Sequence, residues 1–367
     1  MVGAGTKKSP KVVIAGGGTG GHIFPGIAVA REFKRRFPQA EVLFVVGQKE
    51  MEAEIVRRHG FPYESLNVEG IKGRGWLRAL AVGVRLPGSV IRSAAMIGRL
   101  DPDVVLGMGA YSSGPLCLAA CLRGVPTAIH EQNSTPGLTN RILAPWVRRT
   151  FVSFEESIPL LRARSIEMTG NPVREELLGE RTASPRPKGT FRLLVVGGSQ
   201  GARAVNSAFV EALALLKGEG WKPGVLHQAG PGDYETVAKA YEDRGLEGRV
   251  VPFIEDMGRA YQEADLVISR AGATTIAELA ALGKPSVLVP YPYAANRHQD
   301  TNARALADVG GAEVIPQEEL DGPRLARCIT RYMKDPEALR AMGACARAKG
   351  KPEAARLIVD RLLEMIS

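Results

Sequence analysis

Short apolar runs alternate with helical patterns along the whole chain of 367 residues. Runs of this kind are typical of parallel strands that are covered on both faces. They lie near residues 11–15, 41–46, 103–106, 126–129, 191–196, 224–228, 265–269 and 285–289. Strands that alternate with helices form parallel sheets, so the pattern predicts an α/β protein.

The chain makes the same strand–turn–helix pattern twice, about half a chain apart. Residues 12–22 read Val-Val-Ile-Ala-Gly-Gly-Gly-Thr-Gly-Gly-His, and residues 193–203 read Leu-Leu-Val-Val-Gly-Gly-Ser-Gln-Gly-Ala-Arg. Glycines allow a sharp turn and close approach to a ligand, and the following helix presents free N–H groups to an anion. We therefore expect two Rossmann-like domains that face one another across a cleft, with the ligand at the carboxyl ends of the strands.

Composition agrees with a soluble globular protein that has two cores. Hydrophobic residues make up 45% of the chain and charged residues 24%, which are ordinary values. No stretch of about 18 apolar residues is present, and the apolar run that ends at Ala15 is too short for a signal peptide. The four cysteines have no paired metal-ligand spacing, so we expect reduced thiols in a cytosolic protein.

Positive charge is concentrated in the segment 70–100, within a chain of formal net charge +9. Basic and apolar residues alternate there without any acid, which indicates a patch that docks on an anionic membrane surface. The alternative is two ordinary helices, broken at Pro87-Gly88, whose apolar faces belong to the core. Nucleic acid is disfavoured because no nucleic-acid motif accompanies the charge. The residues assigned to the membrane patch are Lys72, Arg74, Trp76, Arg78, Leu80 and Arg85.

The glycine-rich loops indicate a ligand with more than one phosphate group. The first, Gly16-x-Gly18-x-x-Gly21, matches the dinucleotide fingerprint, but the second strand has no carboxylate after it until Glu50, which argues against NAD. A further loop, 107–115, carries the hydroxyls of Ser112 and Ser113. It is either a tight strand-to-helix turn or another anion cradle.

Several polar residues follow predicted strands and are candidates for chemistry. His22 begins the first helix beside its glycine turn, where a histidine suits acid–base work. The run His130-Glu131-Gln132-Asn133 is either a ligand-contacting segment or a hydrogen-bonded loop. In the second half, Glu278 is placed to accept two hydrogen bonds from a ribose diol, unless it is a solvated helix residue.

Six motifs occur in the order found in the MurG family of N-acetylglucosaminyltransferases, which complete lipid II in bacterial peptidoglycan synthesis. They are Gly17-Gly-Thr-Gly-Gly-His22, Gly107-Met-Gly109 with Ser113-Gly114-Pro115, His130-Glu-Gln-Asn133, Gly170-Asn-Pro-Val-Arg174, Gly197-Gly-Ser-Gln-Gly-Ala-Arg203 and His298-Gln299. The chain resembles this family from about residue 11 to its C-terminus.

The resemblance implies a GT-B fold of two Rossmann-like domains. The first, 1–172, would hold the acceptor and the membrane, and the second, 173–350, would hold the nucleotide sugar. A C-terminal helix, 351–367, would return to the first domain. The donor would be UDP-N-acetylglucosamine and the acceptor would be lipid I, undecaprenyl-diphospho-N-acetylmuramoyl-pentapeptide.

The resemblance also implies roles for individual residues. Donor-binding residues would be Thr19, Gly20, Gly21, Asn133, Arg174, Ser199, Ala273, Thr274, Thr275, Glu278, His298 and Gln299. The acceptor diphosphate would lie against Gly17, Gly18, Gly109, Ser112 and Ser113.

The implied reaction is a single inverting attack by the muramoyl 4-hydroxyl on C1 of the donor sugar. His22 is the first candidate for the base and Glu131 the second, while Arg174 and the helix start after Gly201 would meet the departing UDP. The Asp-x-Asp at Asp101-Pro-Asp103 comes before a predicted strand rather than after one, and we expect neither a metal nor another cofactor.

We expect a peripheral protein on the cytoplasmic face of the bacterial cell membrane, with cell-wall or division machinery as candidate partners. The alternatives are a related GT-B enzyme with another lipid or sugar acceptor, a UDP-N-acetylglucosamine 2-epimerase, and a non-catalytic scaffold that binds nucleotide sugars.

Overall fold

The computed structural model describes residues 9–18, 20–67, 76–179 and 190–367, without the side chains of 76–86 and Tyr111. The chain forms two compact units. The first unit is Met1–Arg174 together with Glu353–Ser367, and the second is Glu175–Pro352.

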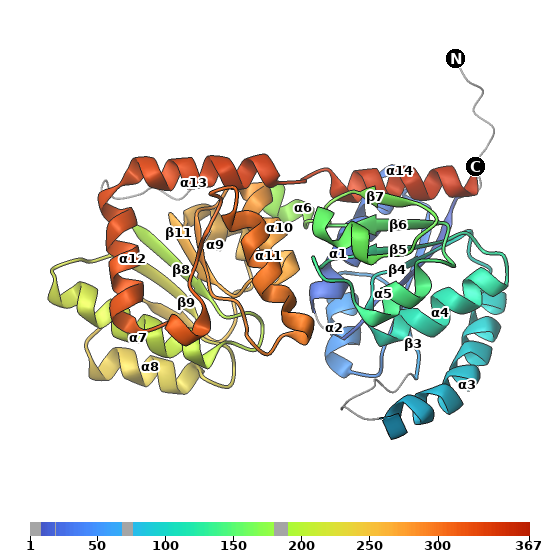
Figure 1. The fold of residues 1–367 in the computed structure, drawn as a ribbon, viewed down its shortest axis with the longest axis horizontal. Coiled ribbons are helices and arrows are strands. Elements are labelled where there is room, and N and C mark those ends of the chain that lie inside the picture. The colour runs from blue at the N-terminus through green and yellow to red at the C-terminus, as the bar shows by residue number, and fades with distance from the viewer. Residues whose placement is uncertain (1–8, 19, 68–75, 180–189) are drawn as a thin grey trace, which may run out of the picture. The chain divides into compact units, whose positions relative to one another are not determined.

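The first unit is built on a parallel sheet in the strand order β3-β2-β1-β4-β5-β6-β7 (Figure 1). Its strands are β1 (Lys11–Ala15), β2 (Glu41–Val46), β3 (Tyr63–Ser65), β4 (Val104–Gly107), β5 (Thr127–Glu131), β6 (Arg149–Val152) and β7 (Ile166–Met168). Its helices are α1 (Gly20–Arg36), α2 (Glu50–Arg58), α3 (Trp76–Leu100), α4 (Ala110–Leu122), α5 (Leu138–Leu143), the 3-10 turn η1 (Glu155–Leu160) and the C-terminal α14 (Ala354–Ile366).

The C-terminal helix α14 packs on the first unit, beside α1. Its apolar positions recur at helical spacing, and Ile358 and Leu362 are fully buried in the same core as Ile27 and Phe33 of α1. Arg36 of α1 donates a hydrogen bond of 2.5 Å to Asp360. The helix therefore buries its apolar face against a unit that lies far away in the sequence.

The second unit repeats the parallel α/β plan in the strand order β10-β9-β8-β11-β12-β13. Its strands are β8 (Arg192–Val196), β9 (Gly224–Gln228), β10 (Arg249–Val251), β11 (Leu266–Ser269), β12 (Ser286–Leu288) and β13 (Glu313–Val314). Its helices are α6 (Glu175–Leu178), α7 (Arg203–Gly218), α8 (Tyr234–Asp243), α9 (Met257–Glu263), α10 (Ala273–Leu282), α11 (His298–Ala307), α12 (Gly322–Lys334) and α13 (Pro336–Lys349), with 3-10 turns η2 (Ala295–Arg297) and η3 (Gln317–Glu319).

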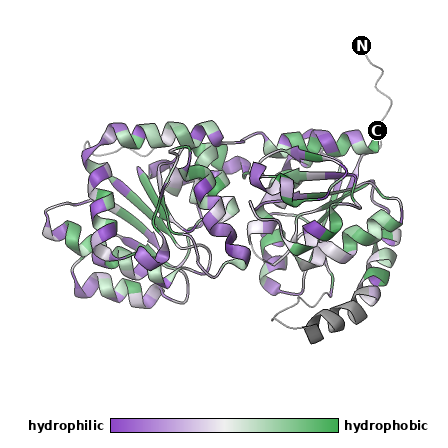
Figure 2. Cartoon of the chain, in the orientation of Figure 1, coloured by the Kyte–Doolittle hydropathy of each residue, from purple (hydrophilic) through white to green (hydrophobic). Residues whose placement is uncertain are grey.

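The structure confirms the α/β class and the parallel strands that the apolar runs predict. Figure 2 shows the hydrophobic strands inside each unit, with hydrophilic positions on the outer helix faces. The expected break at Pro87-Gly88 is wrong, because α3 runs as one helix with Pro87 inside it. Whether the apolar face of 76–86 belongs to the core or to a membrane patch stays open, because these side chains lie outside the described residues. The segment 181–189, a linker candidate in the sequence, lies outside the described residues.

Candidate active site

The glycine-rich loop after β1 is closed by a buried carboxylate that the sequence analysis did not single out. Glu52 of α2 is 2% exposed, and its oxygens accept hydrogen bonds from the backbone N–H groups of Gly18 (2.6 Å) and Gly47 (2.8 Å). A Cβ atom on Gly17 would lie 2.5 Å from the same carboxylate, so glycine is required there. The Gly18 N–H therefore has a partner within the protein, and the placing of the acceptor diphosphate against Gly17 and Gly18 stays a prediction.

His22 lies in the first turn of α1 and is joined to the end of β5 through hydrogen bonds. Its Nδ1 atom is 2.9 Å from Oε1 of Gln132. The Gln132 Nε2 atom donates to the carbonyl of Met108 (2.9 Å) and is 3.1 Å from Nδ1 of His130. His130 Nε2 is in turn 3.0 Å from the carbonyl oxygen of Gly170. A continuous polar chain thus runs along the carboxyl edge of the sheet and ends at His22.

The two histidines of this hydrogen-bond network, His22 and His130, differ in their access to solvent. His130 is fully buried, and desolvation lowers its pKa from the ordinary 6.5 to about 4. His22 is only partly buried. His130 is therefore held neutral at neutral pH, whereas the His22 ring is accessible for proton exchange with a bound molecule.

Glu131, the second candidate for the base, organises the loop that follows β5. It is 2% exposed, and its Oε1 atom accepts from the N–H of Asn133 (3.0 Å). Its Oε2 atom accepts from the N–H of Gly137 (3.0 Å) and from Nδ2 of Asn140 (2.8 Å). Both oxygens are occupied by loop donors, so this geometry favours the hydrogen-bonded-loop interpretation for Glu131 and Asn133.

Two buried polar side chains near the same edge have unused hydrogen-bonding capacity. Ser112 Oγ, in a side chain 4% exposed, and both amide atoms of Asn171, 3% exposed, have no hydrogen-bond partner among the described residues. Such groups are nearly always partnered in folded proteins, so these two are candidates for ligand contact. Ser113 differs, because its hydroxyl donates to the carbonyl of Ala110 (2.9 Å).

Arg174 is held by the first unit. Its guanidinium carbon lies 4.7 Å from the ring centroid of Phe24 in α1, which is a cation–π contact. A Cβ atom on Gly20 would lie 2.8 Å from that ring, so Gly20 provides the room that Phe24 occupies. Gly20 thus has a packing reason to be glycine, in addition to any role toward a donor.

In the second unit, the loop after β8 is fixed by close backbone contact. A Cβ atom on Gly230 would lie only 2.5 Å from Cα of Gly201, whose φ is +79°. Gln228, at the end of β9, donates a hydrogen bond of 2.9 Å to the carbonyl of Gly198. Ser199 is exposed on this fixed loop, where it is accessible to a ligand.

The first turn of α10 has no side-chain cap. Its N-cap residue, Gly272, has extended backbone angles and offers no capping group to the N–H groups that begin the helix. Ala273, Thr274 and Thr275 form this turn. Helix N-termini favour anions, so this turn is a candidate for contact with the donor, as the resemblance implies.

Glu278 is buried inside the second unit. Its side chain is 4% exposed, and the Tyr261 hydroxyl of α9 donates to its Oε2 atom over 3.0 Å. The alternative of a solvated helix glutamate is therefore wrong. Tyr261 was missed in the sequence, because a tyrosine in an amphipathic helix gives no signal of a partner on another helix.

His298 and Gln299 begin α11 after a strained turn. Asn296 and Arg297 have φ values of +51° and +52°, in the left-handed region that non-glycine residues rarely adopt. His298 Nδ1 is hydrogen-bonded to a carbonyl of this turn, and Gln299 Oε1 accepts from the N–H of Tyr291 over 2.9 Å. The turn thus fixes the position of both predicted sugar-binding side chains.

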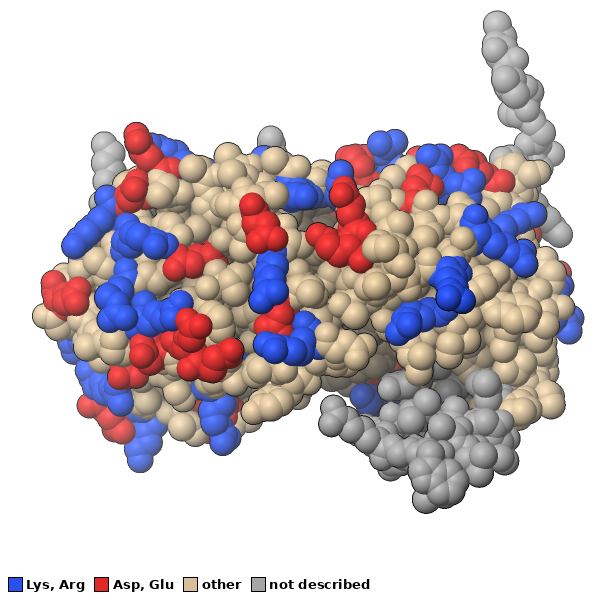
Figure 3. Space-filling view, viewed as in Figure 1, with Lys and Arg blue, Asp and Glu red and all other residues tan. Residues whose placement is uncertain are grey.

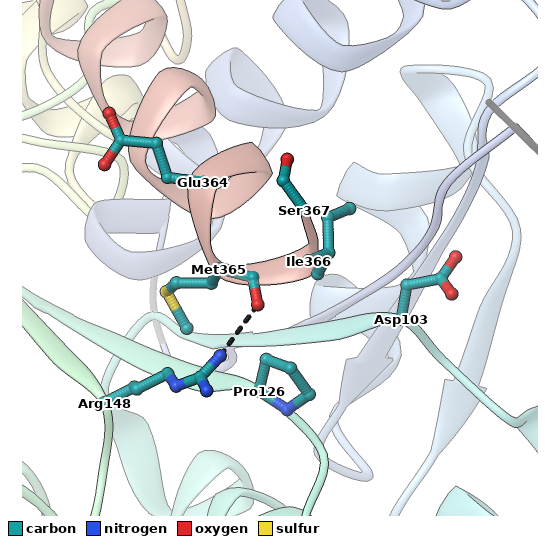
Figure 4. Close-up of a pocket in the computed structure, with 7 residues that line it drawn as sticks. All are labelled: Asp103, Pro126, Arg148, Glu364, Met365, Ile366 and Ser367. Carbon is teal, nitrogen blue, oxygen red and sulfur yellow. Dashed lines mark hydrogen bonds between the residues drawn. The ribbon is translucent and has the colours of Figure 1, made fainter. Parts of the chain in front are cut away.

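A depression of about 520 Å³ lies at the opposite, amino edge of the first unit's sheet (Figure 4). Asp103, Pro126 and Arg148, which precede β4, β5 and β6, line it together with the end of α14. Arg148 donates to the carbonyl of Met365 over 2.8 Å. The depression contains none of the predicted site residues, so it is not the candidate site.

Part of the predicted site cannot be placed. Thr19, Lys72 and Arg74 lie outside the described residues, as do the side chains of Trp76, Arg78, Leu80 and Arg85. Within the described ranges, no helix is long and apolar enough to cross a membrane. The same ranges contain no group of three or more His, Cys, Asp or Glu side chains with metal-binding geometry.

Comparison with known proteins identifies the family of the chain. The glycosyltransferase family 28 N-terminal domain matches residues 12–152, and the family 28 C-terminal domain matches residues 192–358. A relative from Syntrophus aciditrophicus is 46% identical over 97% of this chain and 99% of its own length. It is named UDP-N-acetylglucosamine–N-acetylmuramyl-(pentapeptide) pyrophosphoryl-undecaprenol N-acetylglucosamine transferase.

Solved structures agree as well. The crystal structure of Acinetobacter baumannii MurG is 32% identical, with a TM-score of 0.77 over 97% of this chain and all of that one. A UDP-N-acetylglucosamine 2-epimerase shares the fold, with a TM-score of 0.68 at 17% identity over 98% of this chain and 96% of that one. These matches confirm the GT-B class of the fold. The chain belongs to the MurG family within glycosyltransferase family 28.

Proposed function

We propose that this protein transfers N-acetylglucosamine from UDP-N-acetylglucosamine to the 4-hydroxyl of the muramoyl sugar of lipid I. The transfer inverts C1 of the donor sugar, forms a β-1,4 bond and yields lipid II. The observation that carries this proposal is the 46% identity, over 97% of the chain, to a relative named for this transfer.

His22 is the general base of the proposed reaction. It takes the proton of the muramoyl hydroxyl as that oxygen attacks C1, and UDP leaves with the electron pair of the broken bond. The position of His22 at the end of a polar chain, with a partly exposed ring, supports this role. Glu131 is a poor substitute, because loop donors occupy both of its oxygens.

The second unit holds the donor nucleotide. Glu278 accepts hydrogen bonds from the ribose hydroxyls, and Tyr261 keeps its carboxylate in place. The N–H groups at the start of α10 and the exposed Ser199 hydroxyl serve the diphosphate. His298 and Gln299 are proposed to hold the sugar. Arg174 of the first unit is a further candidate for the donor, whereas the contacts of Asn133 with Glu131 favour a structural role.

The acceptor diphosphate lies against the glycine loops of the first unit. Ser112 has an unused buried hydroxyl there. Gly17, Gly18 and Gly109 are the glycines that the resemblance places against this diphosphate. The ammonium group of Lys49 adds a positive charge beside the first glycine loop, where its Nζ atom donates to the carbonyl oxygen of Gly18 over 3.3 Å.

The protein docks on the cytoplasmic face of the bacterial membrane, where lipid I presents its headgroup. Besides the patch in 70–100, the described residues offer Leu138, Ile142 and Trp146 along and after α5, which are 63%, 58% and 53% exposed. Arg141 is exposed between them. In Figure 3 the face around α4 and α5 is mostly tan and blue, a mixture that suits an anionic lipid surface. Cell-wall or division proteins are further candidate partners.

The test is transfer of labelled N-acetylglucosamine to a short-chain, water-soluble lipid I analogue. We expect one UDP released per sugar transferred, and no UDP release without the analogue. A 2-epimerase would convert the donor with no acceptor present, and a scaffold would bind UDP with no turnover. A related transferase with another acceptor would leave the lipid I analogue unmodified.

A further inference from the structure

We propose that Gln132 is a positioning residue that fixes His22 as the tautomer protonated at Nδ1, so that Nε2 carries the lone pair. The inference rests on the proposed role of His22 as the base, and it names the atom of that base that takes the proton. It follows from the donor and acceptor roles along one buried chain of hydrogen bonds.

The hydrogen-bond network begins at the carbonyl oxygen of Gly170, which can only accept a hydrogen bond. His130 Nε2, 3.0 Å away, therefore carries a hydrogen and donates. A neutral imidazole has one donor and one acceptor nitrogen, so His130 Nδ1 carries a lone pair. Burial keeps His130 neutral, since its pKa is lowered to about 4.

The orientation of the Gln132 amide follows from two acceptors. Its Nε2 atom is 2.9 Å from the carbonyl oxygen of Met108 and 3.1 Å from Nδ1 of His130. The two hydrogens of the amide nitrogen satisfy both of these groups. The reversed amide would place its oxygen against a carbonyl oxygen and a lone pair, which is repulsive. The Gln132 oxygen therefore faces His22.

The last link sets the state of the base. Gln132 Oε1 is an acceptor and lies 2.9 Å from His22 Nδ1, so Nδ1 carries the hydrogen. A neutral His22 then has its lone pair at Nε2. This is the logic by which a third group orients the base in other catalytic sites, here with an amide in place of a carboxylate.

The surroundings leave this arrangement little freedom. Gln132 is 1% exposed, so solvent does not compete for its oxygen. A Cβ atom on Gly109 would lie 3.2 Å from Nδ1 of His22 and 3.5 Å from Oε1 of Gln132. Gly109 thus leaves the space in which the two side chains meet, and its φ of +78° also favours glycine.

The first test needs no variant. The ¹⁵N chemical shifts of the histidine rings are recorded on the full-length protein labelled at histidine, above the pH at which His22 protonates. The His22 signals are assigned by their loss in His22→Gln. We expect the Nδ1–H tautomer at His22. An Nε2–H tautomer would overturn the proposal, whether or not His22 variants are active.

The second test compares Gln132→Leu with Gln132→Glu. The leucine variant lacks the acceptor, so we expect a mixed tautomer at His22 and a kcat lowered by about 10–100-fold, as for other residues that orient a functional group. The donor KM should hold. The glutamate variant again offers an oxygen to Nδ1–H and should regain that tautomer. Its second oxygen faces the Met108 carbonyl and His130 Nδ1 in place of the amide N–H groups, so we expect it to regain only a small part of kcat. Gln132→Leu with unchanged tautomer and kcat would refute the role of Gln132.

The two proposals fail in different ways. Unchanged kcat in His22→Ala would overturn His22 as the base while leaving the tautomer measurement in the wild type as it stands. A large loss in His22→Ala, together with the Nε2–H tautomer in the wild type, would keep His22 as the base and remove Gln132 as the group that sets it.

Discussion

The two units share a fold and each buries a histidine on a strand, but the polar networks around the two histidines end differently. In the first unit the chain from His130 ends at the partly exposed ring of His22. In the second unit His227 of β9 is 3.1 Å from Asn206 Oδ1, and Asn206 Nδ2 donates over 3.2 Å to Asp233. Asp233 pairs with the exposed Arg203 at the start of α7.

This difference indicates a division of labour. The network of the second unit ends in an ion pair between Asp233 and Arg203, so it ties the start of α8 to the start of α7. The network of the first unit ends at the partly exposed imidazole of His22, at the carboxyl edge of the sheet, which is the group that we propose as the proton acceptor. The similar folds of the two units do not distinguish these two networks. The residues at which they end distinguish them: His22 in the first unit, and Asp233 with Arg203 in the second.

The largest effect on kcat is expected from removing the imidazole of His22, where the network of the first unit ends. His22→Ala should lower kcat by about 10²–10⁴-fold, the usual contribution of a general base. Donor binding should hardly change, because the donor is held mainly by the second unit. Initial rates with the soluble lipid I analogue at saturating donor measure this. Near-normal kcat would show that His22 is structural.

Changes at Glu278, in the second unit, should affect donor binding more than turnover, the reverse of the effect of His22→Ala. Glu278→Ala removes a buried carboxylate acceptor and should weaken donor binding by roughly 1.5–3 kcal/mol, with a smaller effect on turnover at saturation. Tyr261→Phe keeps the carboxylate and removes only the hydroxyl that positions it, so it is the matched control and should cost about 0.5–1.5 kcal/mol. An unchanged donor KM in Glu278→Ala would contradict the assignment.

The two buried histidines should make both units sensitive to acid. His130 and His227 have their pKa values lowered by burial from the ordinary 6.5 to about 4. Between these values only the unfolded chain takes up the protons, so stability is present above about pH 6.5 and falls as pH falls toward 4. Urea unfolding should lose about 2 kcal/mol per histidine between pH 7 and pH 5. Equal stability at both pH values would contradict this.

Membrane docking should depend on the first unit alone. Replacing Leu138, Ile142 and Trp146 with Ser should weaken binding to anionic vesicles while activity on the soluble analogue remains. Leu215→Ser, at a 39% exposed position of the second unit, is the control and should bind as the wild type does. Unchanged binding by the triple variant would exclude the α5 surface.

The basic segment is tested by a second set of changes. Trp76→Ser and Leu80→Ser, combined with Arg78→Glu and Arg85→Glu, should reduce vesicle binding by about 1 kcal/mol or more per arginine reversed. Binding by the wild type should also weaken with salt. If this variant binds as well as the wild type, docking belongs to other residues of the first unit.

The smallest effect is expected from metal removal. N–H groups and cations are available for the diphosphate, and the Asp-x-Asp at 101–103 lies at the amino edge of the first unit's sheet, away from the candidate site. Transfer to the soluble analogue should therefore survive EDTA. Loss of activity in EDTA, with rescue by a divalent ion, would show that the leaving diphosphate is neutralised by a metal.

The sequence predicts the central strands well and the outer ones poorly, for a physical reason. Buried strands such as β1 and β8 are apolar runs, whereas edge strands are short and polar, as in Tyr63–Ser65 and Glu313–Val314. The helix at the C-terminus is visible from its periodicity, but its partner is more than 300 residues away in the chain: Arg36 reaches Asp360 with a separation of 324.

The candidate site is predictable only where a motif carries it. The glycine loops, His22 and the 130–133 segment stand out because polar or glycine residues follow apolar strands. The contacts of Glu52 with Gly18, and of Tyr261 with Glu278, join residues that are 34 and 17 positions apart on different elements. Nothing local in the sequence encodes such pairs, so they emerge only from the fold.

The division of labour is tested most directly by measuring UDP-N-acetylglucosamine binding and turnover side by side in His22→Ala and Glu278→Ala. Calorimetry gives the donor Kd, and the soluble analogue gives kcat. The account predicts that His22→Ala keeps the donor Kd within about twofold while kcat falls by about 10²–10⁴-fold. It predicts that Glu278→Ala raises the donor Kd by at least tenfold, in keeping with a loss of roughly 1.5–3 kcal/mol, and largely keeps kcat at saturating donor. If His22→Ala instead loses donor binding and Glu278→Ala loses kcat alone, the assignment of proton transfer to the first unit and donor binding to the second is wrong.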